Sequence, residues 1–276
     1  MRVVVGERLG GPEVLTVAER EAPRPGPGEV VVDVAAAGVN YMDIYQREGI
    51  GNYRPEPPFV PGAEGAGAVA AVGEGVTALA AGDRVAWAGP GRSYAEQVAL
   101  PASGVVPVPD GITLQVAAAA ILQGMTAHYL CTSTYPVRQG DVAVVHAAAG
   151  GVGLLLTQMV KQRGGVVVGT TSGGEKAELV LAAGADHVVG YDRFRAIVDE
   201  ATEGAGAHVV YDGVGRDTFD DGLAALRPRG MMVLYGAASG QVPPLDPQRL
   251  NSGGSLFLTR PTLVHYIADP AELRWR

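Results

Sequence analysis

The feature that most constrains the fold is an alternation of strand-like and helix-like segments from residue 140 onward. "DVAVVHA" (141–147) is a continuous apolar run of strand length, and a helical pattern follows it from about 152 to 163. Further strand-like runs occupy 164–171, 186–191, 207–213, 230–236 and 255–261, and the helical "EKAELVLAAG" follows the first of these. Strands that are apolar along their whole length are typical of a parallel sheet covered by helices on both faces. We therefore predict an α/β domain here.

The first half of the chain has a different pattern. Short valine-rich runs separated by turn residues occupy 2–7, 28–39, 65–73, 82–89 and 93–101, which predicts a β-rich, barrel-like domain. Residues 114–130 form the first strong helical pattern and are expected to connect the two halves. We predict one domain over 1–122, a second over 123–266, and a final segment over 267–276.

Composition excludes several classes of protein. The chain has 276 residues, of which 47% are hydrophobic, and a formal net charge of −8, which disfavours a nucleic-acid or acidic-membrane partner. No apolar run reaches the length of about 18 residues that suggests a membrane span, and the N-terminus does not resemble a signal peptide. Cys131 is the single cysteine, so no intramolecular disulfide can form. We expect a cytoplasmic protein.

The last residues predict the start of a helix. In "ADPAELRWR", Asp269 is a candidate N-cap and Pro270 occupies the first helical position. Six residues follow Pro270. Because so short a helix gains little stability by itself, we expect the sequence to be truncated within this helix.

A stretch of small residues between the first strand and helix of the α/β half predicts a dinucleotide site. The fingerprint G-x-G-x-x-G falls on Ala148, Gly150 and Gly153, with alanine in place of the first glycine. Small residues permit a tight turn and let a pyrophosphate approach the backbone at the helix N-terminus. A turn without a ligand is the alternative, but the position between a buried strand and "LLLTQMV" favours the cofactor.

The end of the second strand indicates which dinucleotide is bound. An NAD site places a carboxylate here, whereas in this chain no acid follows the strand until Glu175. Hydroxyl groups and a cation suit the 2′-phosphate of NADPH, and the candidates are Thr170, Thr171, Ser172, Lys176 and Tyr191. The alternative is that Lys176 is an ordinary solvated cation and Tyr191 an aromatic residue at a strand end.

These motifs, with "AAGVNYMDIYQREG", "AAAAILQGMTAHYL", "YDGVGRDTF" and "NSGGSLFLTRPTL", resemble the NADPH-dependent quinone oxidoreductases. These oxidoreductases form the zeta-crystallin-like branch of the medium-chain dehydrogenase/reductase superfamily, and the resemblance covers essentially the whole chain. It implies an α/β fold with a Rossmann doubly wound parallel sheet plus a GroES-like β-rich catalytic domain. It also implies a homodimer or a tetramer that forms partly through the edge strand "SLFLTRP", and we expect the homodimer.

The resemblance assigns roles to individual residues. Asn40 and Tyr45 are expected to face the nicotinamide and the quinone, Gln123 and Thr126 to approach from the connecting helix, and Tyr53 to line the substrate entrance. The residues expected to bind the cofactor are Asn40, Gln123, Thr126, Gly150, Gly151, Val152, Thr170, Ser172, Gly173, Lys176, Tyr191, Val214, Gly236, Ala237, Ser239, Phe257, Leu258 and Thr259. For Phe257 and Leu258, a role as apolar residues of an edge strand is an equally good interpretation.

No metal site is expected. Where zinc-dependent relatives have G-H-E, this chain has "GAEG", with Ala63 at the histidine position and Glu64 retained. One cysteine and five scattered histidines do not provide the usual zinc ligands. A quinone carbon accepts a hydride without Lewis-acid assistance, and Tyr45 or Tyr53 could hydrogen-bond the hydroquinone oxygen. Asp43 receives no catalytic role.

The leading hypothesis is a zinc-independent NADPH:quinone oxidoreductase that acts on small quinones by one- or two-electron reduction. One alternative is an NADPH-dependent enoyl-type reductase of α,β-unsaturated carbonyls. Another is a non-enzymatic, zeta-crystallin-like protein that binds NADPH.

Overall fold

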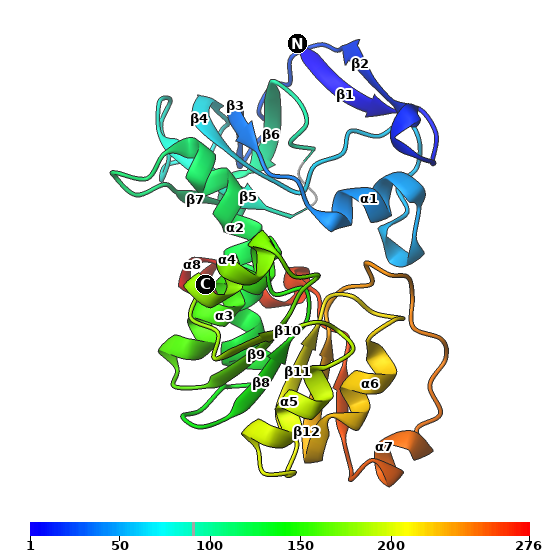
Figure 1. Cartoon of the computed structure of the whole chain (residues 1–276). Coiled ribbons are helices and arrows are strands. Elements are labelled where there is room, and N and C mark those ends of the chain that lie inside the picture. Colours follow the sequence, from blue (N-terminus) through cyan, green and yellow to red (C-terminus); the bar gives the residue numbers. More distant parts are fainter. Residues whose placement is uncertain (90–91) are drawn as a thin grey trace. The chain divides into compact units, whose positions relative to one another are not determined.

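A six-stranded parallel sheet organises the second half of the chain in the computed structural model, which describes residues 1–89 and 92–276 (Figure 1). Its strands are β8 (Val142–Val145), β9 (Val166–Thr170), β10 (His187–Val189), β11 (Ala207–Asp212), β12 (Leu226–Leu234) and β13 (Phe257–Thr259). They lie in the order β10-β9-β8-β11-β12-β13, and every neighbouring pair is parallel. This order reverses between β8 and β11, as in a doubly wound Rossmann fold. The predicted fold of this half is confirmed.

Helices cover both faces of this sheet. They are α3 (Gly151–Gln162), α4 (Glu175–Ala182), α5 (Phe194–Ala201), α6 (Phe219–Ala224) and α7 (Gln248–Ser252). On β8, Ala143 and Val145 pack in a core cluster with residues of α3 and α4, while Val142 and Val144 pack in a second cluster with residues of α5 and α6. Because successive side chains of a strand point to opposite faces, a strand covered on both faces must be apolar throughout.

An antiparallel sheet forms the core of the first half. Its order is β6-β3-β4-β5-β7, and a separate hairpin pairs β1 with β2. The strands are β1 (Arg2–Gly6), β2 (Leu15–Glu19), β3 (Glu29–Ala37), β4 (Glu64–Val72), β5 (Arg84–Ala88), β6 (Gln97–Pro101) and β7 (Val105–Pro107). Trp87 is buried against valines of β3, β4 and β5. This confirms the predicted β-rich half.

Several short helices accompany this antiparallel sheet: η1 (Pro12–Val14), α1 (Tyr41–Glu48), η2 (Gly51–Tyr53) and η3 (Ala102–Gly104). Helix α1 was not predicted from the sequence. It begins where the Asp43 carboxylate accepts the backbone N–H of Asn40 (2.8 Å), and it ends at Gly49, whose φ of 72° lies in the left-handed region that glycine tolerates.

The connecting helix α2 (Leu114–Tyr129) matches its predicted range and continues as a π-helical turn, η4 (Leu130–Thr134). The chain divides into two compact units within α2. One unit contains Met1–Leu122 and Ile267–Trp275, and the other contains Gln123–Tyr266 with Arg276.

The chain's last elements are η5 (Leu263–Tyr266) and α8 (Pro270–Trp275). As predicted, Asp269 caps α8: its Oδ1 accepts the N–H of Ala271 at 2.6 Å. Leu273 is buried, and α8 packs near η3 of the same unit. None of the helices in the described ranges has the length and apolar character needed to cross a membrane.

Candidate active site

The turn from β8 into α3 depends on close backbone packing. A Cβ atom on Gly153 would lie 2.5 Å from the carbonyl oxygen of Ala147 and 2.7 Å from Cα of Ala148, so only glycine permits this approach. Gly150 is the N-cap of α3, and the first N–H groups of the helix have no intrahelical acceptor. Those N–H groups and the positive end of the helix dipole provide a site for an anion.

One residue of this turn has a left-handed backbone. It is Ala147, with a φ of 51°, and not Ala148, which occupies the position of the first glycine of the fingerprint. Ala148 is fully buried, and its Cβ packs beside Gly169 of β9. Ala148 therefore serves the packing between the turn and the sheet, and Ala147 makes the reversal.

Two of the predicted cofactor residues meet at the start of α3. A Cβ on Gly151 would overlap the carboxamide of Gln123, so the glycine makes room for that side chain. Thr126, one turn later on α2, is almost fully buried. The fold therefore brings Gln123 of α2 next to the glycine turn, although the two are distant in sequence, and both belong to one compact unit.

The loop after β9 presents polar groups to solvent. Gly173 and Gly174 have φ values of 88° and 62°, so this loop needs residues that tolerate the left-handed region. Ser172 and Lys176 are exposed. Within the described part of the chain, Lys176 has no ion-pair or hydrogen-bond partner, so its ammonium group is available to an anion.

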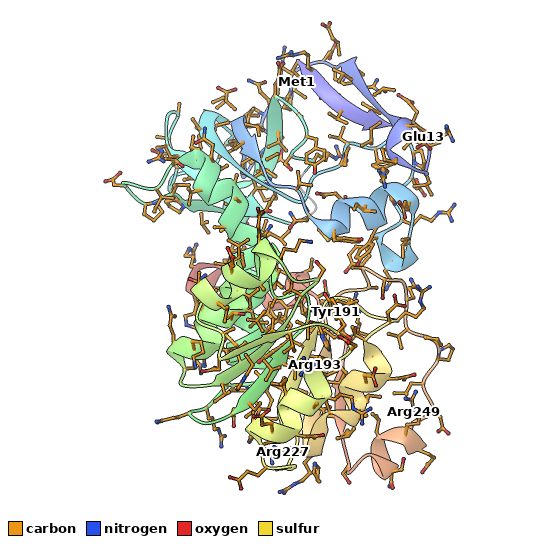
Figure 2. All side chains as sticks on the ribbon, in the orientation of Figure 1. Met1, Glu13, Tyr191, Arg193, Arg227 and Arg249 are labelled. Carbon is orange, nitrogen blue, oxygen red and sulfur yellow. The ribbon has the colours of Figure 1, made fainter. Side chains whose placement is uncertain are left out.

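Tyr191, labelled in Figure 2, lies two residues after the end of β10 and is 36% exposed. Burial of the remainder raises the pKa of its phenol, while hydrogen bonds from Thr170 and the backbone of Ala147 lower it. The structure corrects the expectation that Thr170 offers its hydroxyl to a phosphate. Thr170 is fully buried, and its Oγ1 lies 2.9 Å from Nδ1 of His146, because its side chain points into the covered face of the sheet.

The carboxyl ends of β11 and β12 bring together Val214, Gly236, Ala237 and Ser239, as expected for strand ends at this edge. The Ser239 hydroxyl donates to the Val214 carbonyl at 2.9 Å, and a Cβ on Gly236 would overlap the Gly213 backbone. Asp212, which the sequence analysis did not select, organises the loop after β11. Its buried carboxylate accepts the N–H groups of Val214 (2.7 Å) and Gly215 (2.9 Å) and the Thr218 hydroxyl (2.8 Å).

Strand β13 forms one edge of the parallel sheet. Phe257, Leu258 and Thr259 pair through their backbone with β12, and Phe257 is 56% exposed. No other strand of the described residues pairs with the outer side of β13.

The first unit contains a polar cluster that was not expected from the sequence, consisting of the buried Asp43 and Glu64 and the partly buried Asn40 and Tyr94. Asn40 Nδ2 donates to Glu64 Oε1 at 2.7 Å, and the Tyr94 hydroxyl donates to Asp43 Oδ2 at 2.8 Å. Burial raises the pKa of both carboxyl groups, although the hydrogen bonds they accept act in the opposite direction. The only sequence signal was the N-x-x-D spacing of a helix cap.

These residues do not fit a zinc ion. Ala63 offers no ligand atom, and the Asn40 amide is bonded to Glu64. Zinc in dehydrogenases requires thiolate, imidazole and carboxylate ligands that converge. Among residues 1–89 and 92–276, no three histidine, cysteine, aspartate or glutamate side chains are grouped to hold a metal.

Three tyrosines of α1 and η2 pack against one another. The ring of Tyr45 lies 5.6 Å from those of Tyr41 and Tyr53, and Tyr45 is nearly buried. Tyr53, in η2, is partly exposed. Of the two phenols expected to face a substrate, Tyr53 is therefore the more accessible in this unit.

Comparison with known proteins gives one family match in each of the two compact units of the chain. Residues 26–110 match the alcohol dehydrogenase GroES-like domain, and residues 151–268 match the zinc-binding dehydrogenase family. A quinone oxidoreductase from Pseudomonas aeruginosa is 43% identical over 270 residues, which is 96% of this chain and 82% of that protein. A 2-haloacrylate reductase from Burkholderia sp is 40% identical over 274 residues, with 96% and 82% covered.

Among solved structures, Escherichia coli quinone oxidoreductase in complex with NADPH superposes with a TM-score of 0.95. The two chains are 38% identical, and the match covers 100% of this chain and 85% of the other. With these relatives, the Rossmann sheet and the GroES-like unit, the chain belongs to the quinone oxidoreductase family of the medium-chain dehydrogenase/reductase superfamily.

Proposed function

We propose that this protein is a zinc-independent NADPH:quinone oxidoreductase that reduces small quinones. The observation that carries the proposal is the exposed group after β9. This strand ends without a carboxylate and is followed by Ser172 and by Lys176, which has no partner among the described residues. A hydroxyl and a free ammonium group at this position favour binding of the anionic 2′-phosphate of NADPH, whereas an acid at the end of β9 would favour binding of NADH.

The residues of the second unit suit the other parts of the cofactor. Gly151 and Val152 would offer their N–H groups at the start of α3 to the pyrophosphate, and Gly150, whose own N–H is donated to the Ala147 carbonyl, would let it approach the backbone. Ser172, Gly173, Lys176 and Tyr191 would hold the 2′-phosphate. The remaining contacts are assigned to Gln123, Thr126, Val214, Gly236, Ala237, Ser239, Phe257, Leu258 and Thr259. When bound, NADPH supplies the hydride that a quinone carbon accepts.

The first unit supplies the groups proposed to meet the quinone. Asn40 keeps its carboxamide in one orientation because one of its N–H groups is donated to Glu64. Tyr53 is the accessible phenol, so its hydroxyl is the better candidate to hydrogen-bond the hydroquinone oxygen, and Tyr45 supports it by packing. These roles amount to orientation and hydrogen bonding of an already electrophilic substrate.

A steady-state assay tests this function. We expect the purified protein to oxidise NADPH in the presence of small para-quinones, with kcat/KM for NADPH well above that for NADH. Tyr53→Phe should lower kcat while leaving the affinity for NADPH unchanged. Absence of quinone-dependent NADPH oxidation, with NADPH binding intact, would contradict the proposal.

The similarity to a 2-haloacrylate reductase favours one alternative, reduction of the carbon–carbon double bond of an α,β-unsaturated carbonyl compound. The same assay distinguishes the two by replacing the quinone with 2-chloroacrylate or an enone. A higher kcat/KM for such compounds than for quinones would favour the alternative.

We further propose a homodimer through β13 and a cytoplasmic location. The exposed Phe257 and the unpaired outer side of this strand support pairing with a second copy. Cytoplasmic location is supported by the reaction, since NADPH is regenerated inside the cell. Sedimentation equilibrium of the protein and of Phe257→Lys tests the dimer. A monomer at micromolar concentration would contradict it.

A further inference from the structure

The carboxylate of Glu64 accepts one hydrogen bond on each of its two oxygens. Nδ2 of Asn40 donates to Oε1 at 2.7 Å, and the backbone N–H of Leu122 donates to Oε2 at 2.8 Å. Glu64 is fully buried, and within the described ranges its carboxylate has no other hydrogen bond. Both neighbouring groups are donors. This arrangement suits an ionised carboxylate, which only accepts hydrogen bonds.

The surrounding backbone holds both partners of the bond between Asn40 and Glu64 in place. A Cβ atom on Gly38 would overlap Oε1 and Cδ of Glu64, so the carboxylate fills the space that a side chain at position 38 would take. The Asp43 carboxylate accepts the backbone N–H of Asn40 at 2.8 Å, and the N–H of Asp43 donates to the backbone carbonyl of Asn40 at 3.0 Å. Only the orientation of the Asn40 amide group remains to be determined.

Glu64 determines this orientation. A carboxamide can turn by about 180° with little change in shape, and the turn exchanges its oxygen and its NH2 group. Opposite a carboxylate, which only accepts, the NH2 group of Asn40 must face Glu64, and the carbonyl oxygen Oδ1 must lie on the other branch of the amide. A neutral amide in place of Glu64 would carry a donor of its own and would not enforce this choice. The buried negative charge also polarises the Asn40 amide, which makes Oδ1 a stronger acceptor.

We infer that Glu64 is a positioning residue that presents the Asn40 carbonyl oxygen as a hydrogen-bond acceptor to the nicotinamide half of the cofactor. This inference rests on the proposed function, in which Asn40 faces the nicotinamide. The nicotinamide carboxamide and its ribose carry N–H and O–H donors, whereas a quinone carries none, so an acceptor at this position recognises the cofactor. NADPH and NADH share this half, so Glu64 contributes to the binding of both and not to the choice between them.

Glu64→Gln tests the inference because it keeps the shape of the side chain and adds a donor. Every N–H group stays paired only if the new amide accepts the Leu122 N–H and donates to Asn40, whose amide then turns its oxygen inward. We expect the Kd values of NADPH and NADH, titrated by fluorescence without a quinone, to rise equally by about ten-fold. The Kd of adenosine 2′,5′-bisphosphate, which lacks the nicotinamide half, should not change.

Glu96→Gln is the matched control for this titration. Glu96 also accepts one backbone and one side-chain N–H, at 2.8 and 2.7 Å, and both come from Arg2. The control therefore makes the same chemical change in the same unit, at a carboxylate with no bond to Asn40. All three Kd values should stay unchanged in Glu96→Gln, and urea unfolding checks that each variant is folded.

The double variant Asn40→Asp/Glu64→Gln exchanges the donor and the acceptor of the pair. The new glutamine donates to the new aspartate, whose second oxygen again presents an acceptor to the cofactor. Aspartate is as good an N-cap as asparagine, so α1 keeps its start at position 40. We expect the double variant to recover the affinity for both dinucleotides, whereas Asn40→Asp alone, which places two carboxylates together, should bind them at least as weakly as Glu64→Gln. It also tests the inference if Glu64→Gln alone does not fold.

The outcomes separate this inference from the proposed function. Unchanged NADPH and NADH affinity in a folded Glu64→Gln variant would overturn the inference. A double variant that binds no better than Glu64→Gln would also overturn it, because the N–H of Asn40 would then be the group that binds. Weaker binding of adenosine 2′,5′-bisphosphate in Glu64→Gln would indicate a general structural role. If Lys176→Ala leaves the affinity for that bisphosphate intact, the proposed phosphate site itself is wrong.

Discussion

The carboxylate of Glu64, at the start of β4, accepts the backbone N–H of Leu122 within helix α2 at 2.8 Å. Leu122 is the last residue of the first compact unit before the chain enters the second. Glu64 is fully buried and also accepts a hydrogen bond from Asn40. The Glu64 carboxylate therefore holds two groups by hydrogen bonds. One is the side chain of Asn40, which is expected to face the substrate, and the other is the backbone of Leu122 in α2, where the first unit ends.

This arrangement predicts a pH dependence of stability. Burial raises the pKa of Glu64 above 4.5, with the nearby Asp43 adding to the effect. Between the unfolded value and the raised value the folded state binds more protons, so the free energy of unfolding decreases as pH rises through that window. Glu64→Gln does not titrate, and its stability relative to the unmodified protein should therefore increase from pH 4.5 upward. Urea unfolding across this range measures the difference.

Glu96→Gln is the matched control for Glu64→Gln and should show the opposite trend. Glu96 accepts two hydrogen bonds from Arg2, and these lower its pKa. Its contribution to stability is present above the unfolded value and is lost as pH falls. Parallel curves for Glu64→Gln and the unmodified protein would contradict the assignment of a raised pKa to Glu64.

Tyr94→Phe should destabilise the first unit. The Tyr94 hydroxyl donates to Asp43 Oδ2, and the other carboxylate oxygen, Oδ1, has no partner among the described residues. We expect a loss of about 1–3 kcal/mol at neutral pH, because a buried carboxylate loses a donor. The loss should shrink at low pH, where Asp43 is protonated. Tyr53→Phe is the control, since that phenol has no hydrogen bond to any residue in the described ranges; equal losses in both variants would contradict the prediction.

Gly153→Ala should disturb the glycine turn. The added Cβ would meet backbone atoms of Ala147 and Ala148 that cannot move independently, and overpacking of this kind costs about 1–3 kcal/mol. Gly124→Ala places a Cβ inside α2 where nothing lies within 4 Å, and it should stabilise the protein by about 0.5–1 kcal/mol. Thermal unfolding compares the two. A stable Gly153→Ala variant with unchanged NADPH binding would show that α3 need not lie so close to the turn.

The sequence predicted the parallel sheet well because burial on both faces leaves a continuous apolar run, as in Val142–Val145. The same property explains the error at Thr170. When both faces are covered, the pattern does not reveal which side chain at the strand end points inward, and Thr170 is buried while Ser172, two residues later, is exposed.

The polar cluster of the first unit was beyond sequence reasoning. Asp43 and Tyr94 are 51 residues apart, and Asn40 and Glu64 are 24 apart. Only the register of β3 against β4, which contains a bulge between Val34 and Ala36, brings Glu64 towards Asn40. Helix α1 was missed because its stability depends on this cluster and its caps, and eight residues give little periodic signal.

The most direct test of the account is a fluorescence titration of NADPH and NADH against the protein, Lys176→Ala and Lys161→Ala. Lys161 is the only other lysine and is paired with Asp186, so it controls for loss of a positive charge in the same unit. We predict selective NADPH binding that falls about ten-fold or more in Lys176→Ala, with no change in NADH binding and none in Lys161→Ala. Equal affinity for both dinucleotides, unchanged by Lys176→Ala, would contradict the account.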